Sequence, residues 1–173
     1  MRWVLGVVGL LVVVVLIVCA IGYMLPKSHV ASASARFPAP PDSIWTSLTD
    51  VPAFPTWRPG LSRVELLPDE NGQRGWREFE KNDAITYRVV ESVPPRRLVT
   101  RIADQNLPYG GSWTYDLTPD GSGTRLTITE NGEVYNPIFR FVSRFVLGYT
   151  STMDGVLRAL GAKHGENVSP ERT

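Results

Sequence analysis

The side chains that could do chemistry in this chain are carboxylates and aromatic hydroxyls within predicted strands. Glu78, Tyr87 and Glu130 are candidates for general acid or base roles, because enol chemistry needs a group whose pKa is shifted toward neutrality. Strand residues alternate between two faces, so Glu130 shares a face with Leu126 and Ile128. A carboxylate among apolar side chains must be paired or have a raised pKa, whereas a place in water at the end of the strand would leave Glu130 with no special role.

Large aromatic residues accompany these groups on the same strand faces. Trp113 shares its face with Tyr115, and Tyr87 lies between Ile85 and Val89. One interpretation is a packed core whose polar tips reach the rim. The other is a cavity, mostly apolar, with a few polar anchors. The predicted ligand-binding residues are Trp76, Glu78, Tyr87, Trp113, Tyr115, Glu130, Phe145 and Tyr149.

Composition excludes several functional classes. The chain has 18 Lys and Arg against 17 Asp and Glu, without a basic stripe, so nucleic acid is not an expected partner. It holds one cysteine, Cys19, and two histidines, His29 and His164, far apart in sequence. Motifs for zinc, phosphate and dinucleotide binding and for serine hydrolases are absent. We therefore expect no metal, no cofactor and no assigned catalytic residue, which favours binding over catalysis.

The N-terminus is predicted to be a membrane anchor. Residues 3–25 carry no charge, and as a helix they would be roughly 34 Å long, enough to cross a bilayer core of about 30 Å. The alternative is a cleaved signal peptide, with Ala31-Ser32-Ala33 or Ala33-Ser34-Ala35 as the cleavage site. The apolar run is longer than a signal core, so we predict an uncleaved single-pass anchor over residues 1–27. The short N-terminus favours a cytoplasmic start and an extracytoplasmic domain.

The rest of the chain reads as strands followed by one long helix. Short helical turns are expected in 43–48 and 50–58. The predicted strands are 29–37, 62–67, 73–80, 84–93, 96–103, 111–117 and 124–133. Short connections imply an antiparallel meander with one apolar face.

The closing helix is predicted from a change of period. Asn136 is its expected cap, followed by Pro137 at the first helical position. One apolar face of a helix of about 25 residues is made by Ile138, Val142, Phe145, Tyr149, Met153, Val156 and Leu160. Arg140 falls away from that face. The folded domain is therefore 28–164, and 165–173 is expected to be a disordered tail.

Five stretches together resemble the SRPBCC superfamily, of the START-like and polyketide cyclase/dehydrase type. They are residues 37–50, 54–59, 89–98, 113–119 and 123–130. The resemblance implies an α+β helix-grip fold, in which a seven-stranded antiparallel sheet surrounds a long C-terminal helix and a hydrophobic cavity. It also implies binding of lipids, quinones or polyketides in many members and cyclase activity in a minority. The oxygenase branch needs two histidines and a carboxylate on iron, which His29 and His164 do not supply.

Three functions follow as hypotheses. The first is a membrane-anchored binding protein for a lipophilic small molecule, with the membrane as its second partner. The second is a protein-interaction module like the co-chaperone branch, with Trp57-Arg58-Pro59-Gly60 as an exposed docking loop and no partner identified. The third is a cyclase or dehydratase that uses Glu78, Tyr87 and Glu130.

Overall fold

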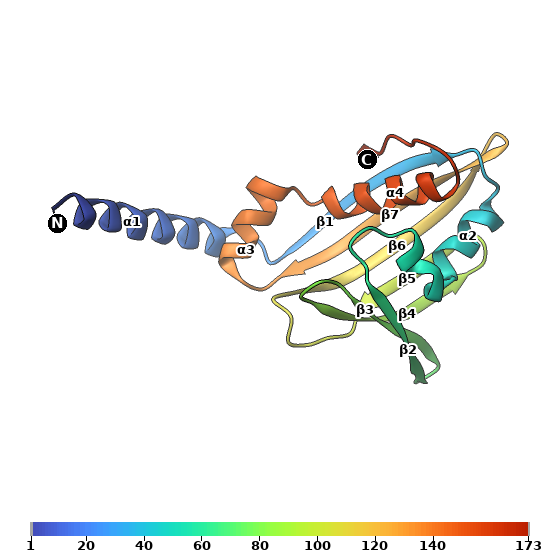
Figure 1. Cartoon of the computed structure of the whole chain (residues 1–173), viewed down its shortest axis with the longest axis horizontal. Coiled ribbons are helices and arrows are strands. Elements are labelled where there is room, and N and C mark those ends of the chain that lie inside the picture. Colours follow the sequence, from blue (N-terminus) through green and yellow to red (C-terminus); the bar gives the residue numbers. More distant parts are fainter. Residues whose placement is uncertain (1, 173) are drawn as a thin grey trace.

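The chain forms one antiparallel sheet with helices packed on one face, and a long N-terminal helix extends from one end (Figure 1). The computed structural model describes residues 2–172. The strands are β1 (Ser28–Phe37), β2 (Arg63–Glu70), β3 (Gln73–Phe79), β4 (Ala84–Val93), β5 (Arg97–Ile102), β6 (Tyr109–Asp120), β7 (Gly123–Val134) and β8 (Glu171–Arg172). The helices are α1 (Arg2–Met24), α2 (Pro41–Thr49), η1 (Val51–Thr56), α3 (Pro137–Val142), η2 (Ser143–Leu147) and α4 (Ser151–Lys163).

The sheet order is β2-β3-β4-β5-β6-β7-β1-β8, with every pair antiparallel. The predicted meander from β2 to β7 is confirmed, and β1 returns to lie beside β7. The α+β fold with an antiparallel sheet and a C-terminal helix is also confirmed. The sheet has eight strands rather than the predicted seven, because the short β8 pairs with β1.

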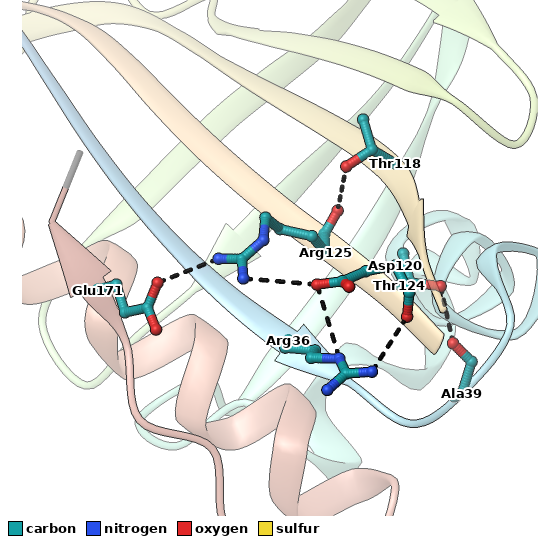
Figure 2. A network of polar contacts seen from close by, with 7 residues as sticks. All are labelled: Arg36, Ala39, Thr118, Asp120, Thr124, Arg125 and Glu171. Atoms are coloured by element: carbon teal, nitrogen blue, oxygen red, sulfur yellow. Dashed lines mark hydrogen bonds and ion pairs between the residues drawn. The ribbon is translucent and has the colours of Figure 1, made fainter. Parts of the chain in front are cut away.

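The C-terminal segment differs from the disordered tail that we predicted over 165–173. Val168 is buried against the core, and the carboxylate of Glu171 lies 3.1 Å from Arg125. Figure 2 shows Arg125 continuing this network to Asp120, which also pairs with Arg36. These ion pairs connect β8 to β1 and to the β6–β7 hairpin, so the described part of the tail belongs to the folded domain.

The main core lies between the sheet and α4. Its large fully buried apolar residues come from β1, α2, β7 and α4, where alternate strand residues face the helices. They are Phe37, Ile44, Leu126, Ile128, Met153, Leu157 and Leu160. A second cluster under η1 contains Val51, Phe54, Leu61 and Trp76.

The predicted single C-terminal helix is broken. Asn136 caps α3 as expected, because its side chain accepts hydrogen bonds from the backbone N–H groups of Ile138 and Phe139. The helix then passes through the π-helical turn η2 and stops at Gly148, whose φ of 75° and ψ of 153° end helical hydrogen bonding. The predicted apolar face is therefore split, since Met153 is fully buried whereas Phe145 is 59% exposed.

Helix α1 is the one helix of the described chain that is long and apolar enough to cross a membrane. Its mean hydropathy is 3.4 and it is exposed along its length, features that an N-terminal signal sequence would share. Its end packs on α3, where Gly22 lies so close to Pro137 that a Cβ would overlap the Pro137 carbonyl. Arg140, which we expected to point away, is buried instead and donates a hydrogen bond of 2.7 Å to the carbonyl of Leu25.

Candidate functional site

The inner face of the sheet gathers most of the predicted ligand-binding residues. Trp76 pairs with Tyr87 across β3 and β4, and Trp113 pairs with Glu130 across β6 and β7. Tyr115 lies opposite Ile128, a core residue under α4. Cross-strand partners share a face, so these side chains and Glu78 all point toward the helices.

Glu78 is the most deeply buried carboxylate of this face, with 4% of its surface exposed. Its Oε1 accepts two hydrogen bonds, one of 2.6 Å from Arg58 Nη1 and one of 2.8 Å from Trp76 Nε1. These two bonds satisfy the carboxylate oxygen inside the domain and fix its orientation. The three side chains therefore form a preorganised polar cluster within an apolar surrounding.

Arg58 reaches this cluster because the chain after η1 folds back over β3. The backbone N–H of Arg58 bonds to the carbonyl of Phe54 at 2.9 Å, which extends the helical turn by one residue. Burial alone would lower the pKa of Arg58, but the Glu78 carboxylate outweighs it and raises the pKa. The guanidinium thus stays charged beside the aromatic rings.

Two tyrosines on the same face are strongly desolvated. Burial raises the pKa of Tyr115 to about 12, with Arg58 acting in the opposite direction. Burial also raises the pKa of Tyr87 far above its ordinary value, and the negative charge of Glu78 adds to the shift. Both hydroxyls therefore remain protonated at neutral pH and are suited to donate a hydrogen bond rather than to act as bases.

Sequence reasoning missed the role of the Trp57-Arg58 pair. We expected an exposed docking loop, but Trp57 is half-buried and contacts both core clusters, and the Arg58 side chain is only 22% exposed. The Nε1 of Trp57 is buried and has no hydrogen-bond partner in the described chain. The sequence feature that could have revealed this burial is the three-residue spacing of Phe54 and Trp57. It puts both rings on one side of a helical turn, with centroids 5.7 Å apart.

A second cluster lies on the same inner face, but on β7 and β1 near η2. Glu130 is 3.8 Å from His29 Nε2, and the His29 ring stacks on Tyr149 with centroids 3.8 Å apart. Gly132 permits this, because a Cβ there would collide with the imidazole. Glu130 and Tyr149 are thus brought together, but apart from Glu78, since β4, β5 and β6 intervene. Phe145 joins neither cluster.

Within residues 2–172 no group of three or more His, Cys, Asp or Glu side chains could hold a metal ion. The chemistry that the inner face offers is hydrogen bonding and charge from Arg58, Trp57 and the two tyrosines, surrounded by apolar rings. Such an arrangement can orient an apolar molecule by one polar end.

The sequence model of the family described as polyketide cyclase/dehydrase and lipid transport matches residues 28–165. No curated protein matches the sequence.

Among solved structures, the di-domain ARO/CYC StfQ from the steffimycin biosynthetic pathway is similar with a TM-score of 0.65 and 14% identity over 79% of this chain. The chain spans half of that protein's length. The ZhuI aromatase/cyclase from Streptomyces sp. R1128 has a TM-score of 0.63 and 16% identity, covering 80% of this chain and 94% of that one. A START superfamily protein from Mycobacterium smegmatis has a TM-score of 0.64 and 17% identity, covering 79% and 97%. At these identities the likeness shows the fold.

Proposed function

Because the chain belongs to the polyketide cyclase/dehydrase and lipid transport family of the SRPBCC superfamily, we propose that it is a membrane-anchored binding protein for a lipophilic small molecule. The molecule, of lipid, quinone or polyketide type, lies between the sheet and the helices that cover it. The proposed ligand-contacting residues are Trp76, Glu78, Tyr87, Trp113, Tyr115 and Glu130, with Tyr149 at the η2 side. Arg58 and Trp57 join them as polar anchors.

The observation that carries this proposal is the state of Tyr115. Burial raises its pKa to about 12, yet the residue is only half-buried. Tyr87 combines the same two properties. Half-buried aromatic residues on the inner face support an interior that the protein's own side chains do not fill, in contrast to the fully buried Ile128 opposite Tyr115.

Arg58 is the proposed anchor for a polar end of the ligand. Only one of its nitrogens is used by Glu78, and a guanidinium carries five N–H donors in a fixed fork. A carbonyl, quinone or carboxylate oxygen is the acceptor that such a group prefers. Trp57 Nε1, on the preceding residue, is buried without a partner in the described chain and offers a second donor.

The position of β1 supports an anchor rather than a cleaved signal peptide. Both Ala-Ser-Ala cleavage motifs lie inside β1, whose residues pair with β7 from Ser28 to Phe37. Cleavage after Ala33 or Ala35 would remove most of this strand and expose Ile128 and Leu126, which lie opposite those residues. Retention of α1 keeps the domain intact at the bilayer, and we place the domain on the extracytoplasmic side.

A cyclase or dehydratase is the second candidate, favoured by the polar cluster around Glu78. The geometry supports it less well. The Glu78 oxygen that faces Arg58 and Trp76 already accepts two hydrogen bonds, and both inner tyrosines hold their protons. A paired carboxylate and two protonated phenols suit ligand orientation better than proton abstraction.

The test is photocrosslinking of the full chain in phosphatidylcholine vesicles that contain a diazirine-bearing fatty acid. We expect crosslinks on Trp113 and Tyr115 in addition to those on α1. Arg58→Gln should reduce the inner-face crosslinks about tenfold, because a hydrogen bond to a charged group contributes ~1.5 kcal/mol or more. Arg97→Gln is the matched control, since Arg97 forms its ion pair with Asp116 outside this cluster at 2.7 Å.

Crosslinks on α1 without any on the inner face would refute ligand binding while leaving the anchor in place. Inner-face crosslinks without any on α1 would refute the anchor alone.

A further inference from the structure

We infer that α3 and η2 form a second membrane contact, in which a patch of exposed apolar side chains enters the bilayer interface beside the end of α1. The patch consists of Ile138, Phe139, Phe145, Val146 and Leu147, which we call the η2 patch. The inference rests on the proposed anchoring of α1, and adds a docking surface on the folded domain.

The apolar residues are concentrated in one place. Within the described residues 28–172, ten large apolar side chains are exposed, and the five of the η2 patch all fall between residues 138 and 147. Val146 and Leu147 are 68% and 63% exposed. Single exposed apolar residues are ordinary, but a run of them on a broken helix marks a surface that something covers.

The contact between α3 and α1 identifies the bilayer as what covers it. Gly22, in the last turn of α1, packs against Pro137, the first residue of α3. Arg140 holds the Leu25 carbonyl, and the N–H of Val134 bonds to the Lys27 carbonyl at 2.8 Å. If residues 3–24 span the hydrocarbon, α3 lies at the depth where the span ends, which is the interface (Figure 1).

The chemistry of the patch suits a lipid interface. Phenylalanine, valine and leucine enter the acyl boundary, while basic side chains meet the headgroup phosphates. Arg144, exposed within η2, lies with its guanidinium 5.9 Å from the ring centre of Tyr149, and it provides such a basic group. A second copy of the chain would need no basic residue here and no continuity with α1.

The contact would also place the His29–Tyr149–Glu130 cluster next to lipid. Tyr149 follows η2 after a single residue, Gly148, and its ring stacks on His29.

The experiment measures the depth of three labelled positions in the full chain reconstituted in phosphatidylcholine vesicles. One protein carries an environment-sensitive fluorophore on the native Cys19. Two others are made in a Cys19→Ala background, one with Val146→Cys in the η2 patch and one with Ser122→Cys in the β6–β7 turn. That turn is exposed and lies at the opposite end of the domain from α1 (Figure 1). Quenching is compared between lipids with a nitroxide on the acyl chain and a water-soluble quencher.

We expect the Cys19 and Val146 positions to be quenched several-fold more by the acyl-chain nitroxide than the Ser122 position. Lipid quenching at Cys19 but not at Val146 would overturn the docking surface and leave the anchor standing. Loss of lipid quenching at both would overturn the anchor and the docking surface together. A Val146 label that is blue-shifted but shielded from both quenchers would mean that protein covers the patch, which also overturns the proposal.

Discussion

Helices α4 and α3–η2 come from one continuous apolar pattern, yet they have opposite environments. In α4 the apolar positions Met153, Leu157 and Leu160 are fully buried against the sheet. In η2 the residues Phe145, Val146 and Leu147 are mostly exposed. The two segments are separated by Gly148, which redirects the chain. Periodicity thus identified side chains that avoid water in both segments, but it did not say whether protein or another phase covers them.

The same amphipathic sequence pattern therefore produces a buried core face in α4 and an exposed apolar surface in η2. The α4 side completes a core that exists without any partner. The large apolar side chains of η2 are mostly exposed, and the preceding α3 packs against the end of the apolar helix α1. Experiments that treat the two segments identically should therefore give different results.

The largest expected difference is between truncation of Leu157 and truncation of Leu147. Leu157→Ala removes buried methyl groups and should lower the free energy of unfolding by ~2–5 kcal/mol. Leu147→Ala, on the exposed turn, should change it by less than about 0.5 kcal/mol in mild detergent. Chemical denaturation of the full chain, followed by tryptophan fluorescence, measures both. Equal losses for the two variants would contradict the separation of core and patch.

The second prediction concerns Gly148, the residue at which the C-terminal helix is interrupted. Gly148 has φ of 75° and ψ of 153°, a region that residues with a Cβ rarely adopt, so Gly148→Ala should cost ~1–3 kcal/mol. Gly155→Ala, inside α4, is the matched control. Its Cβ would meet nothing within 4 Å, and alanine in a helix is favoured over glycine by up to about 1 kcal/mol.

In the same denaturation assay, we expect Gly148→Ala to lower the free energy of unfolding and Gly155→Ala to raise it. A neutral Gly148→Ala would mean that the two segments can join into one helix without loss.

Much of the fold was predictable because its signals are local. Alternating apolar residues with Pro, Asn and Gly turns predicted the strands of the meander, and Asn136 correctly predicted the start of α3. β8 was not predictable, because two residues carry no periodic pattern and are fixed only by pairing with β1 and by Arg125. The burial of Arg140 was not predictable either. Its side chain binds the backbone carbonyls of Leu25 and Tyr135, and these contacts depend on tertiary packing rather than on residue spacing.

The candidate site was predictable only where strand alternation applies. Counting residues puts Trp76 and Glu78 on one face of their strand, and the pairing of Trp76 with Tyr87 adds Tyr87 to that face. Arg58 was missed because it lies on an irregular segment after η1, where no period applies. Its approach to Glu78 depends on how the chain folds over β3.

The smallest predicted effect concerns the far end of α4. His164 ends this helix, and its Nε2 lies 3.1 Å from Ser47 Oγ of α2. Burial, with the positive charge of Lys163, lowers the pKa of His164 below its ordinary value. The folded state therefore favours the neutral imidazole, so the unfolded state binds the proton more readily. Stability should then fall as pH drops below about 6.5 toward the lowered value of the folded state.

His164→Gln keeps a polar partner for Ser47 but cannot titrate, so its stability should depend less on pH over the same range. The measurement is the denaturation midpoint of both proteins between pH 7 and about pH 5. The loss should be smaller than that from either Leu157→Ala or Gly148→Ala, because His164 is only partly removed from water. A fluorophore at position 146 should not respond, since η2 is separated from His164 by the length of α4. An identical pH dependence in the two proteins would show that burial of His164 does not contribute to the attachment of α4 to α2.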